Sequence, residues 1–326
     1  MSHQVALVGD INVDVLLPVE RYPSLGDDAP AQEVLLRPGG TVANTGVVLA
    51  KLGVAVHMTS CVGQDPWAEL ALEALANVGV DLSGVRRTHQ AGTGFVAIPV
   101  TPDGERTMFS YRGANALLRP EDIRPQALAS ARILHMSGYN FMAPTQREAS
   151  FHALAQAREQ GLPLSLDVGL EPARAIPDTV QALLAQTRIL SLGMEEARRL
   201  WGVEEPEAAL AAAAARGAEL IGLKLGGAGC LVAQGDARIR LAGLPVEPVD
   251  TTGAGDAFTA GLIAGWVWGW PLDATALLAN TLGGLATTVW GGGPALPGRD
   301  EVRRYLADRC EAPESRPLLA RLEPGG

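Results

Sequence analysis

The stretch from Asp250 to Phe258, which reads DTTGAGDAF, combines three features that phosphoryl transfer needs. Gly253 and Gly255 let the backbone turn tightly and bring bare N–H groups close to an anion. Asp256 follows them directly, and a carboxylate placed there can accept a proton from a hydroxyl. The apolar run from Ala257 to Trp268 predicts a helix whose positive N-terminal end faces the same anion. From spacing alone, the alternative is an ordinary glycine-rich loop in which Asp256 caps the helix.

Two familiar nucleotide-binding loops are excluded. The only lysines are Lys51 and Lys224, and neither lies in the G-x-x-x-x-G-K-S/T pattern of a P-loop. The segment Gly92–Ala97 fits the dinucleotide pattern G-x-G-x-x-A, but it opens a β-rich segment near Pro99, whereas that pattern should open a helix. Phosphate chemistry in this chain must therefore use another design.

The stretch 250–258 also resembles the second signature of the PfkB, or ribokinase-like, family of carbohydrate kinases. Residues 39–44, GGTVAN, followed by AKLG at 50–53, resemble the first signature, and the opening GDINVD at 9–14 matches as well. Three separated matches in the family's order span nearly the whole chain. The resemblance implies an ATP-dependent kinase that phosphorylates a hydroxyl of a small sugar or sugar-like molecule.

The resemblance also implies roles for individual residues. Asp256 is the expected catalytic base, and Gly253, Ala254 and Gly255 form the expected anion hole for the transferred phosphoryl group. The expected substrate-binding residues are Asn12, Asp14, Gly39, Gly40 and Asn44. Ser137 joins them because it ends a central strand, where open α/β sheets place ligands. From pattern alone, Asn12 and Asp14 could instead lie on the polar surface of an edge strand.

The nucleotide and metal candidates also come mainly from the resemblance. The expected ATP-binding residues are Lys224, Gly226, Gly229, Asn280 and Gly291, although Lys224 could equally point to solvent. Glu196 is expected to organise Mg²⁺ through water, or else to serve only as a first-turn acid of its helix. Asp250 and Thr252 are candidates for a monovalent cation such as K⁺.

The chain departs from the family pattern at two positions. Thr41 stands where ribokinases usually have lysine, which leaves the identity of the sugar open. Gly193 stands in place of the asparagine that usually precedes the glutamate at 196. A nucleoside kinase of the same fold is therefore an alternative, and a non-enzymatic nucleotide- or sugar-binding regulator is an alternative of another class.

The segments that carry these residues belong to a chain in which predicted strands and helices alternate. This alternation predicts an α/β fold with a mostly parallel central sheet flanked by helices. Strands are predicted at 5–8, 32–36, 54–61, 95–100, 107–111, 133–136, 164–167, 189–192, 220–224 and 230–233. Helices are predicted at 41–52, 66–78, 145–160, 179–185, 194–201, 206–215, 257–268, 273–288 and 301–310. We expect one ribokinase-like domain over 1–326, with a small β lid from about 12–36 and 93–115. Residues 311–326 are expected to be loosely held.

The composition limits the classes of partner that we expect this chain to bind. The net charge of −10 argues against nucleic acid and anionic membranes, which attract a basic face. The three cysteines show no C-x-x-C pair, which favours free thiols in a reducing compartment. Together with an N-terminus unlike a signal peptide, this predicts a cytoplasmic protein with a small-molecule substrate. Exposed lid strands could pair across a homodimer.

Overall fold

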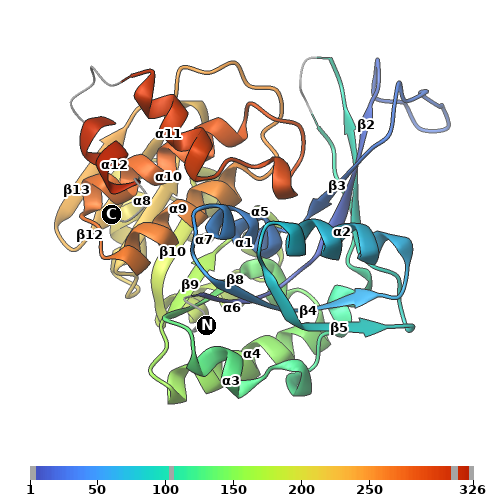
Figure 1. The fold of residues 1–326 in the computed structure, drawn as a ribbon, viewed down its shortest axis with the longest axis horizontal. Helices are drawn as coiled ribbons and strands as arrows, with labels where there is room; N and C mark the ends of the chain where they lie inside the picture. The colour runs from blue at the N-terminus through green and yellow to red at the C-terminus, as the bar shows by residue number, and fades with distance from the viewer. Residues whose placement is uncertain (1–4, 103–105, 310–314, 323–326) are drawn as a thin grey trace.

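The computed structural model describes residues 5–102, 106–309 and 315–322, and it builds them around two sheets (Figure 1). The strands of the large sheet are β1 (Val5–Val8), β4 (Val56–Gly63), β5 (Asp81–Thr88), β8 (Ile133–Ser137), β9 (Leu164–Asp167), β10 (Thr187–Gly193), β11 (Leu220–Lys224), β12 (Cys230–Gln234) and β13 (Ala237–Leu241). They lie in the order β13-β12-β11-β10-β9-β8-β1-β4-β5. The seven strands from β11 to β5 in this order are parallel to their neighbours. Strand β12 pairs antiparallel with both β11 and β13.

Helices cover both faces of the large sheet, because its inner strands are apolar on both sides. In β1, Val5 and Leu7 belong to one buried core and Ala6 and Val8 to the other. The first core is packed by α1 (Thr41–Lys51), α2 (Pro66–Asn77), α9 (Ala254–Trp268), α10 (Leu272–Ala286), α11 (Arg299–Ala307) and α12 (Ser315–Arg321). The second is packed by α3 (Pro125–Ala129), α4 (Pro144–Glu159), α5 (Leu170–Ala175), α6 (Pro177–Leu184), α7 (Met194–Trp201) and α8 (Pro206–Ala214).

The small sheet has four strands and extends away from the helices at the upper right of Figure 1. Its strands are β2 (Asn12–Pro18), β3 (Leu35–Gly39), β6 (Gly94–Val100) and β7 (Phe109–Tyr111), in the order β3-β2-β6-β7. Because β2 starts four residues after β1 ends and β3 leads into α1, the small sheet is joined to the body where the candidate substrate residues lie.

Several elements differ from the sequence prediction. The strand predicted at 32–36 lies at β3, and the helix predicted from 257 begins at Ala254. Strands β5 and β13 were not predicted, because their sequences, DLSGVRRT and ARIRL, are rich in charged and polar residues and lack the apolar runs of the central strands.

The expectation of a loosely held tail was wrong for its described part. Residues 315–321 form α12, and Leu318 and Leu322 are buried in the core with α10 and α11. The rest of that tail, 311–314 and 323–326, lies outside the described residues. No helix within the described ranges is long and apolar enough to cross a bilayer.

Candidate active site

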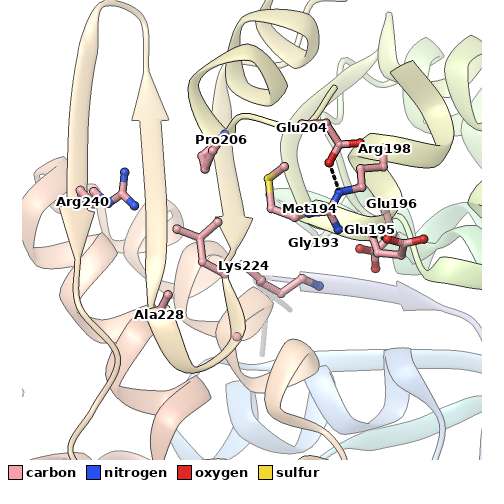
Figure 2. Close-up of a pocket in the computed structure, with 12 residues that line it drawn as sticks. Gly193, Met194, Glu195, Glu196, Arg198, Glu204, Pro206, Lys224, Ala228 and Arg240 are labelled. Carbon is pink, nitrogen blue, oxygen red and sulfur yellow. Dashed lines mark hydrogen bonds and ion pairs between the residues drawn. The ribbon is translucent and has the colours of Figure 1, made fainter. Parts of the chain in front are cut away.

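Two cavities meet at the carboxyl ends of the parallel strands. The larger, of about 740 Å³, is lined by the small sheet, by the start of α1 and by residues 251–256. The smaller, of about 590 Å³, is lined by the start of α7, by the turn after β11 and by Arg240 (Figure 2). Glu196 and Lys224 line both cavities, from α7 and β11 respectively. The arrangement provides two adjoining compartments with a shared boundary.

Asp256 lies in the first turn of α9 and faces the larger cavity. Its Oδ2 accepts a hydrogen bond of 2.8 Å from Nδ2 of Asn44, on α1. Asn44 is held in turn, because its Oδ1 accepts from the backbone N–H of Gly293 at 2.8 Å. Burial, followed by the negative charge of Asp167, raises the pKa of Asp256 to about 7. A carboxyl group with this pKa is suited to accept a proton near neutral pH.

The loop before Asp256 brings backbone amides to the same cavity. Gly253 is the N-cap of α9 and has a φ of 76°, a left-handed conformation that a side chain would strain. Gly253 and Gly255 both line the cavity. The amide of Ala254, the third expected member of the anion hole, instead donates to the carbonyl of Thr251 at 3.3 Å. The N-terminus of α9 therefore points toward the space in front of Asp256.

Lys224 is partly buried, with 21% of its side chain exposed, and its ammonium faces Asp167 instead of open solvent, so the alternative interpretation was wrong. Its Nζ forms an ion pair of 2.9 Å with Oδ1 of Asp167, at the end of β9. Burial alone would lower the pKa of Lys224, but the carboxylates of Asp167 and Glu196 raise it overall. A Cβ added to Gly255 would lie 3.2 Å from this ammonium. A full positive charge therefore stands beside the candidate anion hole.

The candidate substrate residues gather on the opposite wall. Asn12, Asp14, Gly40, Asn44 and Ser137 all line the larger cavity. The edge-strand reading of residues 12 and 14 was wrong, because β2 lies between β3 and β6 and the Asp14 residue is only 5% exposed.

Local contacts shape this wall. Gly39 lies against the Asp14 carboxylate, where a Cβ would clash with it. Oδ1 of Asn12 accepts from Nδ2 of Asn115 at 2.8 Å. Burial, followed by the charge of Asp250, raises the pKa of Asp14 to about 7.

Three carboxylates in or beside the larger cavity are each paired with a cationic side chain. Arg112 is paired with Asp10 at 2.8 Å, Lys224 with Asp167, and Arg106 with Asp250 at 3.2 Å. The two carboxylates with pKa values near 7 are Asp14 and Asp256, the proposed substrate ligand and the proposed base. Asp14 and Asp256 are therefore the two carboxyl groups of this cavity that are poised to exchange protons near neutral pH.

Sequence reasoning did not assign roles to Asn115, which binds Asn12, or to several residues that line this cavity: Asp10, Arg106, Arg112 and Asp167. Only Asp167 had a usable signal, because it ends an apolar strand at the edge where parallel sheets place ligands. The arginines lie on the small sheet or next to it, and their contacts reach across more than 100 residues of sequence.

The expected nucleotide residues separate into two groups. Gly226 and Lys224 line the smaller cavity, with Arg198 and Arg240 (Figure 2). The other three lie elsewhere. Gly229 lies against the backbone after β13, Nδ2 of Asn280 donates to the carbonyl of Ala242 at 2.8 Å, and the amide of Gly291 donates to Oδ2 of Asp250 at 2.8 Å.

Glu196 lies on the first turn of α7, directly behind Gly193. A Cβ at position 193 would clash with the Glu196 carboxylate, so the glycine lets this carboxylate fold back toward the end of β10. Within the described residues, no cluster of three or more His, Cys, Asp or Glu side chains is arranged to hold a metal ion.

Comparison with known proteins places this geometry in context. Residues 2–299 match the family described as pfkB family carbohydrate kinase. A fructokinase of Klebsiella pneumoniae is 32% identical over 94% of this chain and 100% of its own length. An ATP-dependent ribose-1-phosphate kinase of Halopiger xanaduensis is 29% identical over 94% of this chain and 99% of its own. The structure of Arabidopsis thaliana ribokinase complexed with ribose and ATP is 28% identical, with a TM-score of 0.80 over 93% of this chain and 98% of that one.

Proposed function

The chain belongs to the pfkB family of carbohydrate kinases, and from this premise we propose that Asp256 is the base of its phosphoryl transfer. The expected ribokinase-like fold is confirmed, and so is the class of activity, ATP-dependent phosphorylation of a hydroxyl on a small sugar or sugar-like molecule. One observation carries the assignment of Asp256. Its carboxylate, the amides of Gly253 and Gly255, and the Asp14 carboxylate all face one cavity.

The reaction follows from these positions. The acceptor binds against the wall that carries Asn12 and Asp14, and Asp14 accepts hydrogen bonds from its hydroxyls. Asp256 takes the proton of the attacking hydroxyl as that oxygen bonds to the γ-phosphorus of ATP and the bond to the ADP oxygen breaks. Asn44 keeps the Asp256 carboxylate aligned, since it donates to one oxygen and leaves the other available.

Charge on the transferred group is stabilised by the other wall. The amides of Gly253 and Gly255, at the N-terminus of α9, face the γ-phosphoryl group. Lys224 adds an ammonium beside Gly255, held in place by Asp167. This lysine replaces the positive charge that a P-loop would supply.

Glu196 and Lys224 line both cavities, which supports a placement of ATP in the smaller cavity with its phosphates toward this shared boundary. Glu196 would hold Mg²⁺ here, and the bound ion would neutralise phosphate charge. Gly226 borders the nucleotide. Gly229, Asn280 and Gly291 act at a distance, by shaping the backbone that surrounds the site.

The acceptor is a neutral, hydroxyl-rich sugar or a nucleoside, since the larger cavity combines carboxylates and amides with Phe95, Tyr111 and Tyr139. The test is ADP release with ribose, fructose, 2-keto-3-deoxygluconate, inositol, adenosine and guanosine. Turnover of a sugar supports the carbohydrate kinase, and turnover restricted to nucleosides selects the alternative. Tight binding of sugar and ATP without ADP from any acceptor would instead indicate a regulator.

The small sheet is proposed to act as a lid that excludes water and to pair with a second copy of this chain. At its edge strand β7, Phe109 and Tyr111 are exposed, as is the preceding Met108. An apolar, unpaired edge favours association with another strand. Light scattering at micromolar concentration tests this, and a monomeric mass would reject the dimer.

A further inference from the structure

A side chain of the lid reaches the loop that carries the candidate anion hole. Arg106 lies beside the small sheet, where its backbone forms a bridge with Val100, and its guanidinium extends to residues 250–252. Nη1 donates to Oδ1 of Asp250 at 3.2 Å and to Oγ1 of Thr252 at 3.0 Å. The Asp250 side chain is only 4% exposed and that of Arg106 is 29% exposed. The pair is therefore shielded from water mainly on the carboxylate side.

The carboxylate of Asp250 is surrounded by hydrogen-bond donors. Oδ1 accepts from the amide of Thr252 at 2.9 Å and from its hydroxyl at 2.8 Å, in addition to Arg106. Oδ2 accepts from the amide of Gly291 at 2.8 Å. A bound metal cation needs oxygen lone pairs directed at it, whereas these partners direct N–H and O–H groups at the carboxylate. The guanidinium of Arg106, which contacts both side chains, therefore takes the place that a K⁺ ion would need beside Asp250 and Thr252.

We propose that Arg106 is a positioning residue that supplies, from the lid, the positive charge that a monovalent cation would otherwise supply beside Asp250. The inference rests on the kinase function proposed above. Asp250 and Thr252 directly precede Gly253, so the pair holds the start of the anion-hole loop. The same contact holds the hairpin of β6 and β7 over the acceptor cavity, which both Arg106 and Thr252 line.

This arrangement links two events that otherwise would be independent. When the lid closes, the guanidinium neutralises Asp250 and fixes the backbone of Thr252. When the lid opens, Asp250 loses its cationic partner and the backbone of Thr252 loses this restraint. The anion hole is consequently complete only when the lid is closed. Closure therefore suppresses transfer of the phosphoryl group to water and favours its transfer to the bound acceptor.

The experiment uses the full-length protein, Arg106→Met to remove the charge while keeping an extended stem, and Arg106→Lys to restore a charge. Arg238→Met is the matched control. Arg238 lies on another hairpin, is exposed, and donates only to nearby backbone carbonyls. ADP and phosphorylated acceptor are measured separately in potassium, sodium and choline chloride at equal ionic strength. Melting temperature and hydrogen exchange of residues 94–100 and 106–111 are measured in the same buffers.

We expect wild-type turnover to stay within about threefold across the three salts, the scale of ordinary screening effects. For Arg106→Met we expect kcat/KM to fall about tenfold or more, mainly through KM for the acceptor, because coupling between sites is usually of this size. Its ADP should exceed its phosphorylated acceptor, its lid amides should exchange faster, and Arg106→Lys should recover part of each effect. Potassium should raise the melting temperature of Arg106→Met alone. Only this variant has no cationic side chain beside Asp250, so only here can K⁺ bind and stabilise the folded protein.

Two results would overturn the inference. One is stimulation of the wild type by potassium beyond about threefold relative to choline, since screening does not distinguish these ions. The other is an Arg106→Met variant that matches Arg238→Met in acceptor KM, product ratio and lid exchange. Absence of turnover by the wild type with every acceptor would count against the proposed function instead. Lid exchange and the effect of potassium on melting would still decide the role of Arg106.

Discussion

Replacement of Asp256 by asparagine separates the chemical role of this residue from its effect on stability. The change keeps the shape of the side chain and its contact with Asn44, and it removes a carboxyl group whose pKa is raised from 3.8 to about 7. A raised pKa means that the unfolded chain releases this proton at lower pH than the folded protein. Wild-type stability therefore falls as pH rises from about 4 to about 7, and the full cost is present above pH 7.

The size of the cost follows from the same values. The difference between 3.8 and about 7 corresponds to roughly 4 kcal/mol, at about 1.4 kcal/mol per pH unit. Because Asp256 is only partly buried and borders a cavity open to water, screening reduces this to about 2 kcal/mol. We expect Asp256→Asn to be more stable than the wild type by about this amount at pH 8, with a smaller difference at pH 5.

The same variant should be nearly inactive. Loss of general-base assistance lowers kcat by about 10²–10⁴. Urea unfolding followed by tryptophan fluorescence at pH 5 and pH 8 measures the stability, and ADP release measures the activity. Asp236→Asn, in the exposed turn between β12 and β13, is the matched control and should change neither quantity.

Either half of the expectation can fail on its own. Turnover near that of the wild type would refute the assignment of Asp256 as the base. A free energy of unfolding that does not exceed the wild-type value at pH 8, or exceeds it equally at pH 5, would refute the argument that desolvation raises its pKa.

Three further substitutions probe the groups around this carboxylate. Asn44→Ala removes a hydrogen bond that lowers the pKa of Asp256, so the acidic limb of the kcat/KM profile should move to higher pH; an unmoved limb would contradict this. Lys224→Met leaves Asp167 without its ion-pair partner, so it should cost about 3–5 kcal/mol in urea unfolding. It should also lower kcat more than it raises KM, and an unchanged kcat would count against the lysine. Gly253→Ala forces a side chain into a φ of 76° at a cost of about 1–2 kcal/mol. Its kcat should fall while calorimetry still detects acceptor binding, and wild-type kcat would argue against the anion hole.

The parts of the fold that could be predicted are those with a local cause. Strand β1 is a short apolar run, VALV, and the GAGD sequence marks the start of α9 because glycine and a following acid are favoured there. Edge strands β5 and β13 were missed because their burial is one-sided and their sequences resemble exposed loops.

The partners within the site had no comparable signal. Lys224 and Asp167 are 57 residues apart, and Arg106 and Asp250 are 144 apart. Nothing in either short segment specifies the other, because pairing depends on the order of strands in the sheet and on the path of the lid. Sequence could therefore locate the candidate base and the glycine turn, but not the ion pairs that set the charge of their surroundings.

The hydrogen bond between Asn44 and Asp256 joins positions 212 residues apart. During synthesis, the acceptor wall leaves the ribosome long before α9 exists, and an incomplete chain has neither the base nor the amides that activate ATP. We therefore expect growing chains to consume no nucleotide.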